Sequence, residues 1–203
     1  VSIHVLGIKG FATLDGIAEV LGAAPEDVKD VLDGLVDDGL AAAPGGMYRL
    51  SDAGRDRHGE VMDRERSSIG ADRAGTLLDE FLVLDQRMKE TVTAWQLREA
   101  APGAPPVVND HADPHYDRGV LDRLAALAED ADAWLAGAEP ALPRLAEYRR
   151  RLGRAARIAA AGDARYVASP RVDSFHGAWF ELHEDLILLA GRTRADEEAA
   201  GRA

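Results

Sequence analysis

The sequence contains no cysteine among its 203 residues. Disulfide bonds, thiolate zinc sites and cysteine nucleophiles are therefore excluded. Long apolar runs are also missing: the longest uncharged stretches, such as 81–84 and 186–191, are far shorter than the roughly 18 to 20 residues that a membrane-spanning helix needs. No signal peptide is visible, so we expect a cytoplasmic protein that does not enter a membrane.

The common sequence signatures of catalysis are absent as well. There is no Gly-rich phosphate loop, no nucleophile elbow and no His-Glu-x-x-His motif. Residues 109–115 gather oxygen and imidazole groups, but Asp113 already has a role as a helix cap, so we assign no metal there. We predict that the protein is not an enzyme and assign it neither a catalytic residue nor a cofactor.

Positive charge, which nucleic-acid binders usually carry in excess, is lacking too. The formal net charge is −12. Residues 1–66 contain seven Lys and Arg side chains against thirteen Asp and Glu side chains, a balance of −6, and the rest of the chain has the same balance. The composition therefore disfavours a function that depends on neutralising phosphates.

What the sequence does contain is an ordered set of helix boundaries between Thr13 and Leu50. Thr13 is placed to cap a short helix that Gly22 ends, and Pro25 begins a second helix that Gly39 ends. Apolar residues follow the helical period in this second helix: Val28, Val31, Leu32, Leu35 and Val36. Residues 40–43 and 47–50 predict two short strands around a Pro-Gly-Gly turn. With a first helix at 2–9, the pattern predicts a winged helix-turn-helix with a two-stranded wing.

Two family resemblances start from these residues. Residues 48–55, Tyr-Arg-Leu-Ser-Asp-Ala-Gly-Arg, resemble the junction between wing strand and helix in MarR-like regulators. This resemblance covers about residues 1–66 and implies DNA binding as a dimer. Residues 7–13, Gly-Ile-Lys-Gly-Phe-Ala-Thr, are similar to helix-turn-helix segments associated with actinobacterial phosphoenolpyruvate-utilising, pyruvate phosphate dikinase-like proteins. This second similarity implies an accessory role beside such an enzyme.

The remaining residues predict helices. We expect them at 51–66, 72–100, 114–135, 141–161 and 169–190, with a break at 67–70 and Gly137 as a stop. The predicted protein is therefore mainly α, with a winged helix-turn-helix domain at 1–66 and a helical bundle at 67–192. Residues 101–113 form a Pro-rich linker inside the bundle, and 193–203 form a polar tail.

The helix predicted at 72–100 carries an apolar seam with spacings of four and three residues: Leu77, Phe81, Leu84, Met88, Val92 and Trp95. Such a seam needs a partner helix, from the same chain or from a second copy. Because the seam is longer than the remaining helices would cover, we predict a homodimer.

Aromatic, imidazole and guanidinium groups in the bundle predict a pocket for an acidic small-molecule effector. Its predicted residues are Trp95, Arg150, Arg154, His176 and Trp179, and Asp173 is expected to set the protonation of His176. The simpler alternatives are a His176 that is buried and satisfied by a neighbour, and arginines that pair with Glu129, Asp130 and Asp132 of the preceding helix.

In a helix-turn-helix, the second helix enters the major groove of DNA. Here its outer face carries Glu26, Asp27, Asp30, Asp33, Asp37 and Asp38 against Lys29 alone, and the helix dipole supplies only about half a positive charge. The cations left for phosphates are Lys9, Lys29, Arg49, Arg55 and Arg57. We therefore predict a MarR-like transcriptional regulator with a dimerising, effector-sensing bundle but weak DNA affinity. The alternative is a winged-helix protein-interaction module that does not bind DNA, accessory to a phosphoenolpyruvate-utilising enzyme.

Overall fold

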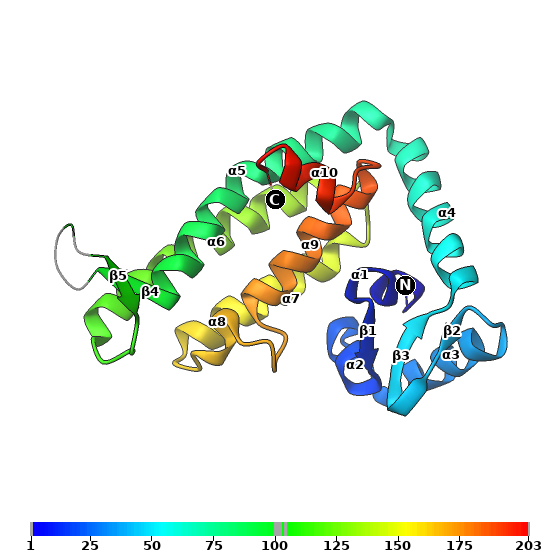
Figure 1. Cartoon of the computed structure of the whole chain (residues 1–203), viewed down its shortest axis with the longest axis horizontal. Coiled ribbons are helices and arrows are strands. Elements are labelled where there is room, and N and C mark those ends of the chain that lie inside the picture. Colours follow the sequence, from blue (N-terminus) through cyan, green and yellow to red (C-terminus); the bar gives the residue numbers. More distant parts are fainter. Residues whose placement is uncertain (1, 100–102, 104, 203) are drawn as a thin grey trace.

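The computed structural model describes residues 2–99, 103 and 105–202. The chain is mainly helical, with a small three-stranded antiparallel sheet and a separate two-stranded hairpin (Figure 1). Figure 1 shows an N-terminal lobe that contains the three-stranded sheet and a longer helical bundle, with α4 running from the one to the other. In the described part of the chain, each helix is too short or too polar to cross a bilayer.

The N-terminal lobe is built from short elements. Its helices are α1 (Ser2–Lys9), α2 (Leu14–Leu21) and α3 (Pro25–Asp37), and its strands are β1 (Phe11–Thr13), β2 (Ala41–Ala42) and β3 (Met47–Leu50). The side chain of Thr13 accepts a hydrogen bond from the Gly16 N–H, and Gly22 ends α2 with a left-handed φ of 60°. Both helix boundaries are those that the sequence predicts.

The sheet has one strand more than the sequence predicts. Its order is β1-β3-β2, with Ala12 opposite Tyr48 and Ala41 opposite Leu50. The prediction of only two strands was wrong because β1 is three residues long and lies directly before the first turn of α2, which leaves no alternating pattern to find. Between β2 and β3 lies only the turn η1 (Pro44–Gly46).

The bundle contains the longer helices. These are α5 (Ala71–Gln96), α6 (Pro114–Ala138), α7 (Leu145–Ala160) and α9 (Phe175–Leu189), and α4 (Asp52–Ile69) enters from the lobe. Two short helices, α8 (Arg165–Ala168) and α10 (Arg194–Ala199), follow α7 and α9. The buried apolar side chains form two clusters, one in the lobe and one in the bundle, and Met62 of α4 belongs to the bundle cluster.

The seam of α5 is buried within this chain. Leu77 and Phe81 are 0% exposed, Met88 is 2% exposed, and they share one apolar cluster with side chains of α6 and α9. The reason for predicting a homodimer was therefore wrong, since the bundle covers the seam itself. The homodimer remains a prediction without that support.

Two segments predicted to lack regular structure contain some. Within the expected linker, β5 (Pro106–Val108) pairs with β4 (Leu97–Glu99), so the helix predicted to reach residue 100 ends at Gln96. Within the expected tail, Thr193 caps α10 and Glu197 is fully buried, where it pairs with Arg192 and Arg202. Both errors have one cause: these short elements are stabilised by tertiary contacts and not by periodicity.

Two helix boundaries were also misplaced. Gly137 lies inside α6, because one glycine costs a helix only about 1 kcal/mol and the buried Leu135 and Ala138 offset that cost. The last long helix begins at Phe175, where the Ser174 side chain accepts a hydrogen bond from the Gly177 N–H at 3.2 Å. The Ser-Pro pair at 169–170, which predicted an earlier start, lies in the irregular segment after α8.

Candidate functional site

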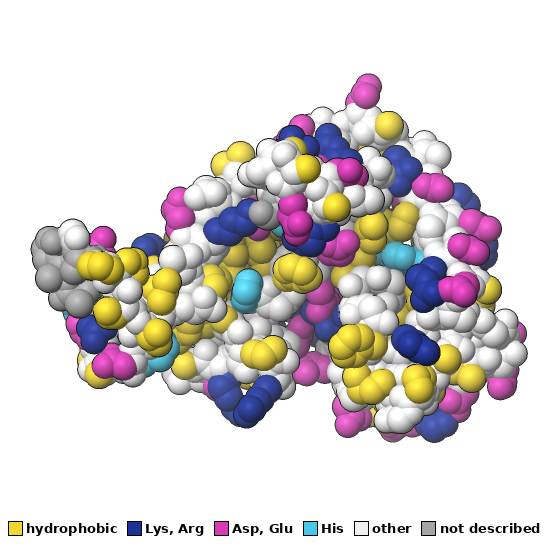
Figure 2. All heavy atoms as spheres, viewed as in Figure 1, with side chains coloured by type: hydrophobic (Ala, Val, Ile, Leu, Met, Phe, Trp, Pro, Cys, Tyr) yellow, Lys and Arg dark blue, Asp and Glu magenta, His cyan; other side chains and the backbone are white. Residues whose placement is uncertain are grey.

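The outer surface of α3 is an acidic face. Val28 and Leu32 point into the lobe core, at 3% and 0% exposure, which leaves the other side of the helix to solvent. The exposed and half-exposed carboxylates of this acidic face are Glu26, Asp27, Asp30, Asp33, Asp37 and Asp38. Val31 and Val36 lie at the two edges of this face, beside the buried side of the helix, and are 52% and 36% exposed. Figure 2 shows Asp and Glu side chains along the lower rim of the N-terminal lobe.

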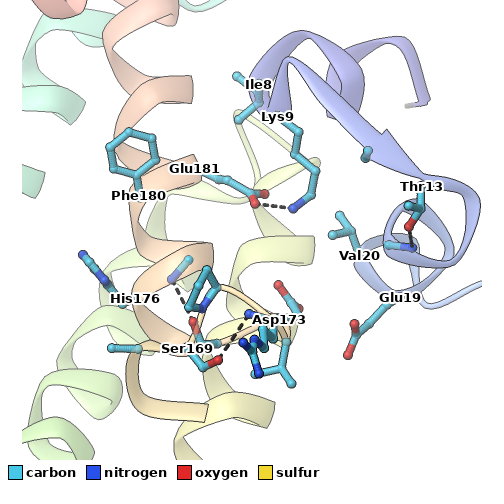
Figure 3. Close-up of a pocket in the computed structure, with 18 of the residues that line it drawn as sticks. Ile8, Lys9, Thr13, Glu19, Val20, Ser169, Asp173, His176, Phe180 and Glu181 are labelled. Atoms are coloured by element: carbon cyan, nitrogen blue, oxygen red, sulfur yellow. Dashed lines mark hydrogen bonds and ion pairs between the residues drawn. The ribbon is translucent and has the colours of Figure 1, made fainter. Parts of the chain in front are cut away.

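Two of the cations predicted to contact phosphates are engaged elsewhere. The Lys9 ammonium, at the end of α1, contacts the Glu181 carboxylate of α9, as Figure 3 shows, so it faces the bundle. Lys29 pairs with Asp33 one turn further along α3. The single cation of α3 is thus neutralised on its own helix, and the acidic face has no unpaired counter-charge of its own.

The other three cations lie around the short turn and at the start of α4. Arg49 is exposed on β3, and it has no ion-pair partner within the described residues. Arg55 pairs with Asp52, and Arg57 pairs with Glu60 at 2.8 Å. Exposed pairs of this kind are worth at most about 1 kcal/mol, so a phosphate would displace them easily. These two pairs therefore leave Arg55 and Arg57 accessible to an anion.

A buried polar cluster joins the lobe to the bundle. His4 of α1 lies 2.9 Å from Asp185 of α9 through Nε2 and 3.1 Å from His58 of α4 through Nδ1. Asp185 is fully buried and also accepts from the Arg144 guanidinium, at 2.5 and 3.2 Å. The remaining edge of that guanidinium pairs with Glu65 at 2.5 Å. The cluster therefore links α1, α4 and α9.

The environment of this cluster shifts the pKa of several of its groups, including His58 and Asp185. Burial lowers the pKa of His58 to about 4, and the neighbouring His4 ring adds to the effect. Burial alone would raise the pKa of Asp185, but His4 and Arg144 hold it well below its usual range. The neutral imidazole and the charged carboxylate are thus the forms that the folded protein favours near neutral pH.

A second ionic group lies beside a cleft between the lobe and the bundle. The buried Arg151 of α7 donates to Asp173 at 2.6 Å and pairs with Glu181 at 2.9 Å. Figure 3 shows Asp173 and Glu181 on the bundle side of this cleft, with Lys9 reaching Glu181 from the lobe. The cleft has a volume of about 540 Å³. Lys9 and Arg151 already have carboxylates here, whereas Arg171 also lines the cleft and has no ion-pair partner within the described residues.

The structure separates the arginines of the predicted pocket from its aromatic residues. Arg150 donates to the Val20 carbonyl at 2.5 Å, and Arg154 pairs with Glu19 at 3.0 Å, so both tie α7 to α2. The simpler alternative, pairing with the preceding helix, holds in one case only: Arg149 binds Asp132. Arg150 and Arg154 therefore hold the lobe on the bundle, whereas Arg149 joins two helices of the bundle.

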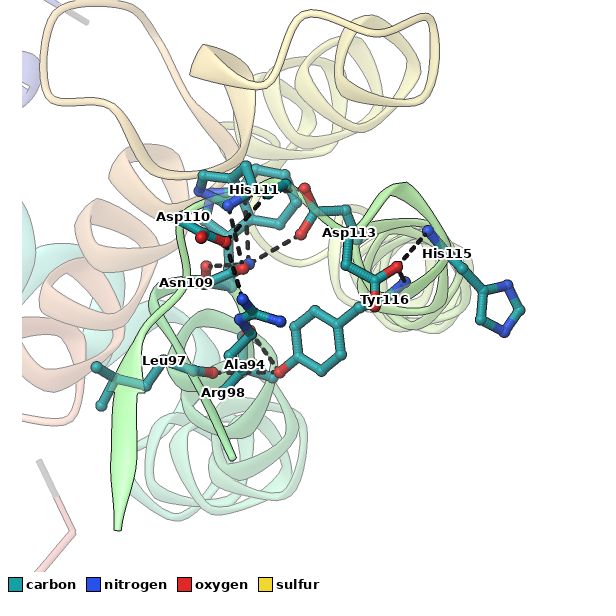
Figure 4. Close-up of polar contacts among 12 residues, drawn as sticks. Ala94, Leu97, Arg98, Asn109, Asp110, His111, Asp113, His115 and Tyr116 are labelled. Atoms are coloured by element: carbon teal, nitrogen blue, oxygen red, sulfur yellow. Dashed lines mark hydrogen bonds and ion pairs between the residues drawn. The ribbon is translucent and has the colours of Figure 1, made fainter. Parts of the chain in front are cut away.

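Trp95 lies at the far end of α5, where it supports the β4–β5 hairpin. The centre of its ring is 4.4 Å from that of His111, and the side chain of Asn109 donates to the Trp95 carbonyl at 3.1 Å. Figure 4 shows how Tyr116, from α6, reaches the backbone carbonyls of Ala94 and Leu97 in the same network.

This position separates Trp95 from the other aromatic residue of the predicted pocket. Trp179 contacts α5 at Asp85, ten residues before Trp95, and ten residues of helix span about 15 Å. The prediction that Trp95 shares a pocket with Trp179 was therefore wrong.

His176 and Trp179 do line one cavity, of about 310 Å³, between α5 and α9. The Trp179 indole N–H donates to Asp85 at 2.9 Å. Burial lowers the pKa of His176, and the carboxylate that opposes this shift is Asp85. The expectation that Asp173 sets this protonation was wrong, because Asp173 is held by Arg151.

The sequence interpretation missed the residues that organise these sites. Asp85, Arg151 and Asp185 are polar side chains inside otherwise apolar helix faces, at 4%, 2% and 0% exposure. Their positions in the helical period mark them as inward-facing, which is a signal that the sequence does contain. Their partners come from other elements, and the sequence gives no indication of those.

Comparison with known proteins identifies no relative. No protein-family model matches the chain, and no match is found among the curated proteins or the solved structures.

Proposed function

We propose that the protein is a winged-helix interaction module whose acidic α3 face docks on a basic surface of a partner protein. In this proposal α2 and α3 form the helix-turn-helix, and the β1-β3-β2 sheet with its short turn forms the wing. The observation that carries the proposal is the outer surface of α3, where six carboxylates lie between the exposed Val31 and Val36 at its two edges.

Charge decides between the two kinds of partner. A protein surface rich in Lys and Arg is attracted to the acidic face, and the two valines add apolar contact at its edges. A DNA backbone carries one negative charge per phosphate and is repelled by the same face. The lobe as a whole does not reverse this sign, because residues 1–66 carry a formal charge of −6.

A MarR-like transcriptional regulator, binding DNA as a homodimer and responding to an acidic effector, is the second candidate. One observation favours it: α3 is free at the surface, and Arg49 is exposed on the strand beside the short turn, the two places from which such a protein contacts DNA. The weakness of this candidate is that only Arg49, Arg55 and Arg57 are available to phosphates, against six carboxylates on α3.

The similarity of residues 7–13 to segments associated with phosphoenolpyruvate-utilising enzymes names the first partner to test. A gene for such an enzyme beside the gene for this chain would support the proposal, whereas a divergent operon would support the regulator.

Two binding experiments test the proposal directly. In the first, the full chain is titrated with its own upstream DNA at rising salt, and we expect weak binding with a shallow salt dependence. In the second, the neighbouring enzyme is titrated with the wild-type chain, with the α3 double variant Asp27→Lys, Asp30→Lys, and with the double variant Asp122→Lys, Glu129→Lys on the exposed side of α6 as the charge-matched control. We expect only the α3 double variant to lose binding. Tight sequence-specific DNA binding at about 150 mM salt, or binding that ignores charge reversal on α3, would overturn the proposal.

A further inference from the structure

The cavity between α5 and α9 is lined by buried polar groups as well as by apolar ones. Asp85 and His183 are each 4% exposed, and Met88, Val92 and Trp179 supply an apolar wall that is also buried. At the rim, Phe180 is 51% exposed and Lys89 is half exposed. The cavity is thus open to solvent at one side and closed by the bundle at the other.

Two buried nitrogen atoms of residues that line this cavity lack a hydrogen-bond partner within the described residues: His183 Nε2 and Arg194 Nη2. Proteins rarely leave buried polar atoms unpaired, so each such atom calls for a specific explanation. Both residues line one cavity, so a single bound molecule pairs with both nitrogen atoms once the side chains that cover them shift slightly.

The surroundings of His183 determine which kind of hydrogen-bond partner its Nε2 atom requires. Burial lowers the pKa of His183, so its ring is neutral near pH 7. Its Nδ1 lies 3.7 Å from the Asp85 carboxylate, which favours the proton on Nδ1 and leaves Nε2 as an acceptor. The missing partner of Nε2 is therefore a hydrogen-bond donor.

The surroundings of Arg194 define the second requirement. Its Nε donates to Glu184 at 2.9 Å, and its guanidinium lies 4.3 Å above the Phe180 ring, so the group is fixed in position. A guanidinium only donates, so Nη2 needs an acceptor. The Lys89 ammonium, 3.1 Å from Asp85, has further N–H groups to offer beside it. Both cations already have a carboxylate, so these N–H groups, and not an excess of charge, would hold an acidic ligand.

We propose that this cavity binds a small hydroxy acid with an apolar substituent. The hydroxyl donates to His183 Nε2, the carboxylate accepts from Arg194 Nη2, and the apolar substituent packs on Trp179 and Phe180. The volume of about 310 Å³ suits a molecule with a single aromatic ring. This site is separate from the acidic face of α3, and the inference does not depend on the proposed function.

The test uses 2-hydroxy-3-phenylpropanoate as the probe, titrated into the full chain by isothermal calorimetry. We expect saturable one-to-one binding. The analogue 3-phenylpropanoate, which lacks the hydroxyl, examines the His183 contact without altering the protein, and we expect it to bind about tenfold more weakly.

The variant Arg194→Gln examines the carboxylate contact. Arg194 lies near the surface on α10, and we expect its loss to weaken binding of the probe about tenfold. The matched control is Arg165→Gln, an exposed arginine paired with Asp163 away from the cavity, which should bind as the wild type does. Absence of saturable binding at about 10 mM probe overturns the inference, as does binding that neither the missing hydroxyl nor Arg194→Gln weakens.

Discussion

The buried His58 should make the free energy of unfolding depend on pH. Its folded pKa is about 4, against 6.5 for an ordinary histidine, because the ring is buried between α1 and α4 beside His4. Below pH 6.5 the His58 ring therefore becomes protonated in the unfolded chain, whereas in the folded protein it becomes protonated only near pH 4. The free energy of unfolding must fall as pH falls through this window.

The size of the effect follows from the shift. At 1.36 kcal/mol per pKa unit, the shift of His58 corresponds to roughly 3 kcal/mol as a ceiling, and we expect about 2 kcal/mol to be lost by pH 4.5. The depressed pKa of Asp185 acts in the same direction but at lower pH, because an unfolded aspartate binds its proton only near pH 4. His176 and His183, whose pKa values burial also lowers, add to the loss within the window.

The measurement is urea unfolding followed by far-ultraviolet circular dichroism between pH 7.5 and pH 4.5. His58→Gln keeps a side chain able to hydrogen-bond with His4 Nδ1 but does not titrate, so its stability should fall by about 2 kcal/mol less than that of the wild type over this range. His115→Gln, at an exposed position, is the control and should follow the wild type. If His58→Gln and the wild type lose stability in parallel, the assignment of the acid sensitivity to His58 is wrong.

Two further predictions concern packing and buried charge, and both are checked by the same unfolding measurement. A methyl group added at Gly54 would lie 1.9 Å from the Leu40 carbonyl oxygen, so Gly54→Ala should destabilise the protein by about 1 to 3 kcal/mol. Its control is Gly59→Ala on the same helix, where the methyl group meets no other atom. This variant should stabilise the protein by up to about 1 kcal/mol. Arg151→Met leaves the buried Asp173 without its counter-charge and Glu181 with Lys9 alone, and should cost about 3 to 5 kcal/mol. Arg165→Met, at an exposed ion pair, should change stability by less than about 1 kcal/mol. Equal effects within either pair of variants would contradict the argument.

The sequence predicts the elements that local rules determine. Thr13 and Ser51 cap their helices by accepting a hydrogen bond from a residue three positions away, and Pro25 begins its helix because its φ is fixed and it has no N–H. All three lie where they are expected. The apolar seam of α5 is predicted for the same reason, since periodicity is a local property.

Elements that depend on distant partners are not predictable in this way. The strand β1 exists because β3 lies beside it, and α10 is held by the buried Glu197. The candidate sites show the same limit. The sequence places His176 and Trp179 on one helix, but only the fold brings Asp85 beside Trp179 and His183, from a position ninety or more residues earlier.

The contacts between the lobe and the bundle determine which surfaces of the lobe are accessible to a partner. The bundle holds the lobe through α1, α2 and α4: His4 reaches Asp185, Glu19 reaches Arg154, and Glu65 reaches Arg144. Freeing Lys9 for a phosphate would require breaking its pair with Glu181 and leaving that carboxylate largely buried, whereas α3 is exposed without any rearrangement. The ionic contacts that fix the lobe therefore remove a cation from a DNA surface and at the same time present the carboxylates of α3, and both effects favour a basic protein over a nucleic acid as the partner of this face.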